Sequence, residues 1–126
     1  MIGAAKELVE ATVKHVLLEL DGEIPENEDM PVLTKRALAK LNLHPTAIAP
    51  TKKGAEIMMR ILGGQAQTAP GLAELRNLGY GTGHGQGRRI KGLKRRHAEL
   101  AARSATTFAA FVLDTLHDED APWRKD

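Results

Sequence analysis

The chain has 126 residues, a length that suits one domain, because two halves would each bury too little surface to fold well alone. It contains no cysteine, which excludes disulfides, thiolate zinc sites and thiol nucleophiles, and its net charge of only +2 does not by itself indicate a nucleic-acid partner. Hydrophobic residues make up 42% of the chain with few aromatics among them, and a core of Leu, Ala, Val, Ile and Met favours helices over sheets.

The first half of the chain predicts two helices. From residue 2 to 20, apolar side chains recur at spacings of three and four, the pattern of one helical stripe. An acidic loop follows. The same periodicity returns over 31–43, where Pro31 suits a first helical turn and the His44-Pro45 step ends the helix.

A third helix is predicted to begin with Thr51 as its cap and to continue to the Gly63-Gly64 pair. We expect it to resume over 65–78 with Pro70 as a kink, because leucines recur there every three residues. A full break at the glycines would give five helices in place of four.

A joint and a last helix complete the predicted fold. Residues 79–87 contain five glycines, which cannot propagate a helix without a large entropic cost. The segment 93–116 predicts a helix whose inward face includes Leu100, Phe108 and Phe111. The sequence therefore predicts an all-α, antiparallel four-helix or five-helix bundle, with a single domain over 1–118 and a mobile tail over 119–126.

Positive charge is concentrated in one interval of the sequence. No acidic residue lies between Glu74 and Glu99, whereas seven basic residues do. Such a run attracts and holds a nucleic-acid backbone, and an aromatic ring beside it can stack on a base. The residues predicted to bind RNA are Tyr80, Arg88, Arg89, Lys91, Lys94 and Arg95. The alternative is a solvated helix face that serves solubility alone.

Arg76, Asn77 and His84 form the candidate catalytic group. The first two end the third predicted helix, and His84 follows in the glycine-rich joint, which can fold back towards that helix end. Arg76 is a permanent cation with a planar fork of donors for phosphate, Asn77 can orient a side chain or substrate, and His84 exchanges a proton near neutral pH. Cleavage of RNA by its own 2′-hydroxyl needs a base, an acid and positive charge near phosphorus, without a metal or other cofactor.

Each of these features also has a purely structural interpretation. A glycine-rich stretch between helices commonly serves as a turn, and this one follows no predicted strand and matches no phosphate-loop motif. In the same interpretation Arg76 pairs with an acid such as Glu74 or caps the helix, and His84 bonds a backbone carbonyl. The other histidines show no i,i+4 pair, so no metal site is predicted.

Three stretches carry a resemblance to a known family. They are Ile-Gly-Ala-Ala-Lys-Glu-Leu-Val-Glu at 2–10, Leu-Arg-Asn-Leu-Gly-Tyr-Gly-Thr-Gly-His-Gly at 75–85 and Ala-Ala-Arg-Ser-Ala-Thr-Thr-Phe at 101–108. Across nearly the whole chain, the sequence resembles the C-terminal domain of abortive-infection proteins, a member of the HEPN group of helical bundles in bacterial phage defence and toxin systems. The resemblance implies a metal-independent RNase with Arg76, Asn77 and His84 as its site. Seven residues separate Arg76 from His84, more than the family's usual spacing, so the site is either rebuilt around a longer loop or lost.

The resemblance also implies partners. They are RNA, a second copy of the chain in a homodimer with the two loops facing each other, and an antitoxin or a fused sensor domain. No apolar run is long enough to span a membrane, so we expect a cytoplasmic protein without a membrane partner. The rival function is a non-catalytic module of a defence protein that dimerises and binds nucleic acid or protein, and a purely structural domain is the third reading.

Overall fold

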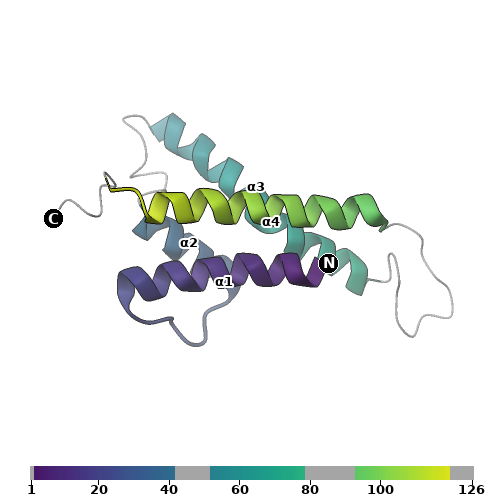
Figure 1. The fold of residues 1–126 in the computed structure, drawn as a ribbon, viewed down its shortest axis with the longest axis horizontal. Coiled ribbons are helices and arrows are strands. Elements are labelled where there is room, and N and C mark those ends of the chain that lie inside the picture. Colours follow the sequence, from purple (N-terminus) through teal and green to yellow (C-terminus); the bar gives the residue numbers. More distant parts are fainter. Residues whose placement is uncertain (1, 42–51, 79–92, 120–126) are drawn as a thin grey trace.

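The computed structural model describes residues 2–41, 52–78 and 93–119, which form four α-helices and no strand (Figure 1). The helices are α1 (Ile2–Asp21), α2 (Met30–Lys40), α3 (Lys52–Asn77) and α4 (Arg95–Leu116). The predicted all-α four-helix bundle is confirmed. From residue 120 onwards, the predicted tail lies outside the described residues.

The helices differ in direction. In Figure 1, α3 runs antiparallel to α1 and α4, which share one direction. The last residues of α1 and α2 are joined by an ion pair between Asp21 Oδ1 and Lys40 Nζ at 3.2 Å, and the loop between these helices folds back along α1. Thus α2 also runs in the direction of α1, and α3 alone reverses it.

One hydrophobic core joins the four helices. Phe108 of α4 is its largest fully buried side chain, and aliphatic side chains surround it. The other fully buried side chains are Leu17, Leu38, Leu41, Leu62, Val13, Val16 and Val112. Because α4 contacts both α1 and α3, and α1 contacts every other helix, the core lies between the helices along the length of the bundle.

The five-helix alternative is wrong for the described residues, because α3 continues through Gly63, Gly64 and Pro70. Pro70 has no N–H to donate to the carbonyl of Ala66, and glycines weaken a helix interior. However, α3 buries an apolar face that includes Leu62 and Leu72 against the core, and such packing outweighs weak local propensity.

Several apolar side chains of α3 and α4 face solvent, in contrast to the prediction. Leu100 and Phe111 were expected to point inward but are 53% and 39% exposed. On α3, Ile57, Ile61 and Leu75 are also exposed. Both helices have apolar residues on more than one face, and periodicity alone does not tell which face meets the core.

Within the described ranges, no helix is long and apolar enough to cross a membrane.

Candidate functional site

Arg76 and Asn77 are the last two residues of α3, and both side chains are exposed. The amide of Leu78 donates to the Glu74 carbonyl at 3.0 Å, so the last helical turn is closed around them. No ion pair joins Arg76 to Glu74, so the pairing named in the structural interpretation is not formed. A guanidinium at this end of a helix is favoured by the helix dipole. The structure therefore holds Arg76 on a regular backbone and leaves its donors open to solvent.

Lys94 begins α4. Its backbone is extended, and its N–H donates to Nδ1 of His97 at 3.0 Å, an interaction that caps the helix. The side chain of Lys94 itself is exposed. The predicted RNA contact at Lys94 thus has its side chain free to reach a phosphate.

Glu99 joins two arginines along one side of α4. Its Oε1 lies 3.1 Å from Arg95 Nε, and its Oε2 lies 3.7 Å from Arg103 Nη2. The arginine side chains are 90% and 81% exposed, so the shared carboxylate aligns them along the helix without burying them. These surface ion pairs contribute little to stability, but they compete with any phosphate for the guanidinium groups.

Two further exposed cations, Arg96 and Arg103, lie on the same part of α4. Arg96 belongs to the basic run between Glu74 and Glu99, but neither residue is among the six predicted to bind RNA. Their spacing of seven residues is the signal, because it puts both side chains on one side of the helix. Three cations in succession, from Lys94 to Arg96, stand at the positive end of the α4 dipole, and the first turn has no acid. That arrangement is unfavourable for the helix alone, and an anion bound there would offset the repulsion.

One end of the bundle carries two of these helix termini. Figure 1 shows the C-terminal end of α3 and the N-terminal end of α4 at the same end of the bundle. Arg76 and Asn77 therefore share this end with Lys94, Arg95 and Arg96. The opposite end carries the end of α1 and the acidic loop after it, so charge is separated along the long axis.

A comparison with protein families shows to which family this chain belongs. A family model described as a HEPN-like domain, Abi_C, matches residues 1–116. The chain belongs to this HEPN-like family. The resemblance drawn from the sequence is thus confirmed, and membership points to a defence-related role. No curated protein and no solved structure matches the chain significantly.

Part of the predicted site of this HEPN-like domain lies outside the described residues. These positions are Tyr80, His84, Arg88, Arg89 and Lys91. The structure thus brings Arg76 and Asn77 to the same end as Lys94 and Arg95, whereas the approach of His84 to Arg76 stays a prediction.

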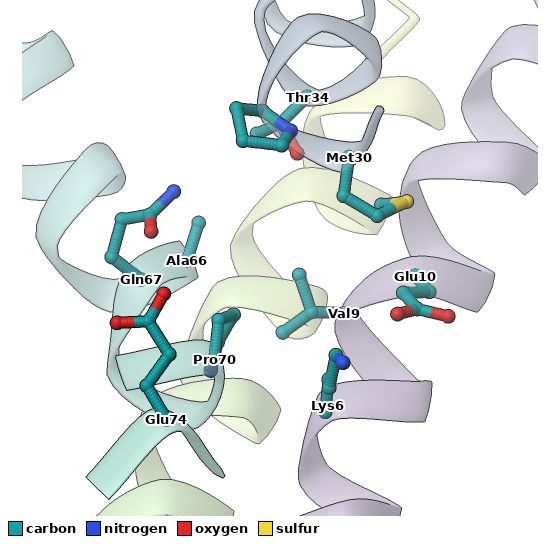
Figure 2. A pocket seen from close by; sticks show the side chains of 10 residues that line it. Lys6, Val9, Glu10, Met30, Thr34, Ala66, Gln67, Pro70 and Glu74 are labelled. Carbon is teal, nitrogen blue, oxygen red and sulfur yellow. The ribbon is translucent and has the colours of Figure 1, made fainter. Parts of the chain in front are cut away.

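The HEPN-like domain also has a pocket between α1, α2 and α3, with a cavity volume of about 270 Å³ (Figure 2). Glu10 and Lys6 line it from α1, and Gln67 and Glu74 line it from α3, over a floor that includes Val9. Two carboxylates and one ammonium group give this pocket a net negative charge, which is unsuited to a phosphate backbone. The pocket therefore differs in charge from the end of the bundle that carries Arg76, Lys94, Arg95 and Arg96, which we call the basic end.

Proposed function

We propose that this HEPN-like domain is a metal-independent endoribonuclease of a phage-defence or toxin system. The observation that supports the proposal is the placement of an exposed arginine and asparagine at the end of α3, at the same end of the bundle as the exposed cations at the start of α4. Arg76 and Asn77 suit contact with one phosphate at the cleavage site, and the cations at the start of α4 suit the neighbouring phosphates of the RNA chain.

The reaction is an attack of a ribose 2′-hydroxyl on the adjacent phosphorus. His84 takes the hydroxyl proton while solvent water protonates the leaving 5′-oxygen, or His84 protonates the 5′-oxygen while water takes the hydroxyl proton. In either case the bond from 2′-oxygen to phosphorus forms as the bond to the 5′-oxygen breaks. Arg76 stabilises the charge that develops on the phosphorane, and Asn77 orients His84 or the substrate. The products are a 2′,3′-cyclic phosphate and a 5′-hydroxyl.

Binding of the polymer is assigned to the basic end of the bundle. Lys94 and Arg95 contact backbone phosphates there. From the sequence alone, phosphate contacts are also proposed for Arg88, Arg89 and Lys91, and base stacking for Tyr80. The exposed side chains of Lys94 and Arg95 support this assignment, as does the absence of any acid in the first turn of α4. Phosphate bound at this helix end meets both the side-chain charges and the helix dipole.

A pair of variants separates catalysis from binding. In excess chelator, we expect His84→Ala to stop cleavage of labelled single-stranded RNA while the RNA dissociation constant stays within about twofold, because a single imidazole among several Lys and Arg side chains contributes little to backbone binding. Changing Arg95 and Arg96 together to alanine should weaken binding and flatten its dependence on salt. Cleavage that survives in His84→Ala would refute the proposed role of this histidine.

The second candidate function is a non-catalytic module that dimerises and binds nucleic acid or protein within a defence system. The exposed apolar side chains on the outer face of α3 favour it, because they offer a surface to a second chain. An antitoxin or a fused sensor domain is the other proposed partner. This function predicts RNA binding without turnover in the wild-type protein.

Glu99 provides a test of the basic end itself. We expect Glu99→Gln to bind RNA several-fold more tightly than wild type, because the change removes one negative charge and releases both Arg95 and Arg103 for phosphate. Fluorescence anisotropy at several salt concentrations measures the effect, which should be largest at low salt.

Asp114→Asn is the matched control for Glu99→Gln. It removes the same charge from an exposed position of α4, but roughly 22 Å further along the helix. That distance exceeds two screening lengths at physiological salt, so RNA affinity should not change. An equal gain in both variants would show that net charge, and not the cations released from Glu99, sets the affinity.

A further inference from the structure

The pocket between α1, α2 and α3 has a carboxylate on each of two opposite sides. Figure 2 shows Glu10 of α1 and Glu74 of α3 across the pocket from each other, with Val9 and Pro70 between them. Val9 is buried and Pro70 is half-buried, whereas Glu10 is half-buried and Glu74 is exposed. The pocket is therefore negatively charged on two sides and apolar in the middle.

Neither carboxylate is neutralised by a neighbour within the described part of the chain. No ion pair there includes Glu10 or Glu74. Lys6 lies one helical turn before Glu10 and also lines the pocket, but its side chain is exposed and forms no ion pair with Glu10. Both carboxylates are thus available to a cationic ligand.

Backbone and side-chain oxygens add hydrogen-bond acceptors to the pocket. A carbonyl in a helix points towards the N–H of the residue one turn later, and for Ala66 that residue is Pro70, which has no N–H. The Ala66 carbonyl thus lacks its usual helical donor, and both residues line the pocket. Gln67 and Thr34 line it as well, and each has a side-chain oxygen that can accept. This lining suits a ligand that donates several N–H hydrogen bonds.

The size and charge of the pocket restrict the class of ligand. Its volume of about 270 Å³ lies just below the roughly 300 to 1,000 Å³ of pockets for drug-sized ligands, so a smaller molecule fits. An anion is repelled by the net negative charge. A metal ion is disfavoured, because the described residues include no group of three His, Cys, Asp or Glu side chains that could hold one. These limits favour a small organic cation with charge at both ends and an apolar chain between them.

We propose that this pocket binds a linear aliphatic diamine, with one ammonium group on Glu10 and the other on Glu74. Each contact between ammonium and carboxylate is a charge-assisted hydrogen bond, and the methylene chain displaces water from Val9 and Pro70. The ammonium group on the α3 side also donates to the Ala66 carbonyl. The bound ligand joins α1 to α3. Because binding is measured without RNA, the inference does not depend on the proposed nuclease.

Calorimetric titration of the full chain with amines of different shape tests the class of ligand. 1,4-Diaminobutane should bind at a single site per chain, and 1-aminobutane should bind at least roughly tenfold more weakly, because it lacks the second ammonium group. Diamines of increasing length should show an optimum, since the folded chain fixes the separation of the two carboxylates. Undetectable binding of every diamine would overturn the proposal. Equal or tighter binding of Nα-acetyl-lysine amide would also overturn it, and would indicate a protein side chain as the occupant.

Substitution of the carboxylates tests the place of binding. Glu10→Gln and Glu74→Gln should each weaken binding of the best diamine by roughly tenfold, because each removes the partner of one ammonium group. Glu7→Gln and Glu56→Gln are the matched controls, since they remove the same charge from exposed positions of α1 and α3 that do not line the pocket. Both controls should stay within about twofold of wild type at physiological salt. Equal losses in all of these variants would show an effect of net charge alone and would contradict the proposed site.

Lys6 and Pro70 give tests in which a purely structural role predicts a different result. Lys6→Gln should tighten diamine binding several-fold, because it removes a cation that competes with the ligand for Glu10. Pro70→Ala should raise the unfolding temperature of the free protein but weaken diamine binding, because alanine restores the N–H that the Ala66 carbonyl lacks. Unchanged diamine affinity in both variants would overturn the inference. Diamine binding without RNA cleavage would refute the nuclease alone, and RNA cleavage without diamine binding would refute the diamine site alone.

Discussion

Arg76→Ala should lower the rate of metal-independent RNA cleavage by on the order of 10² to 10³-fold. The guanidinium is proposed to stabilise charge that develops on the phosphorane, so its loss affects the transition state more than the bound substrate. RNA affinity should therefore change little. Initial cleavage rates in excess chelator, measured beside binding of an RNA with a 2′-deoxy nucleotide at the cleavage site, separate the two quantities.

Arg36→Ala is the control for this variant. Arg36 is also an exposed arginine on a helix, but it lies on α2, away from the end of the bundle that holds Arg76. Both changes remove one positive charge, and both should leave the fold intact because neither arginine forms an ion pair among the described residues. A similar loss of cleavage in both variants, or a loss of affinity that accounts for the whole effect of Arg76→Ala, would contradict the catalytic role.

Phe108→Ala should have the largest effect on stability, with a loss of roughly 3 to 5 kcal/mol in the free energy of unfolding. The Phe108 side chain is fully buried in the core, so its removal leaves a cavity as well as a loss of apolar contact. Since a domain of this size is stabilised by only about 5 to 15 kcal/mol, much of the protein should be unfolded at moderate temperature. Urea unfolding followed by helical circular dichroism measures the loss.

Phe111→Ala makes the same chemical change on the same helix at a side chain that is 39% exposed. It should cost well under half as much, because much of the ring already contacts water and no closed cavity forms. Equal losses in the two variants would show that the burial of Phe108 does not describe the core of the folded protein.

The helices could be predicted from sequence because their signals are local. Spacing of apolar residues located α1, and Pro31 indicated the first turn of α2. The structure adds the cap at Asp29, whose side chain accepts from the Val32 amide at 3.3 Å. Continuity of α3 was harder to predict, because two glycines and a proline weaken the local signal while long-range packing holds the helix together. Which of the two apolar faces of α3 is buried also depends on where the neighbouring helices pack, and the spacing of apolar residues within α3 carries no information about that.

Only part of the candidate site could be predicted, because some of its residues are positioned by local helix signals and others by contacts or loop conformations that the sequence pattern does not define. The positions of Arg76 and Asn77 follow from the end of an apolar helical pattern, and the structure confirms both at the end of α3. Arg103 was missing from the predicted RNA-binding residues, because its place beside Arg95 depends on their shared contact with Glu99. His84 stands between alternating glycines, which allow many backbone conformations, so the sequence pattern does not define where its imidazole lies.

The most direct test of the nuclease is the chemistry of the ends that wild-type protein leaves on RNA in the presence of excess chelator. The proposed mechanism predicts fragments with a 2′,3′-cyclic phosphate and a 5′-hydroxyl, identified by mass spectrometry, and predicts no cut at a single 2′-deoxy nucleotide placed at the cleavage site. Intact RNA, or fragments with 5′-phosphates that appear only when a divalent metal is restored, would contradict it.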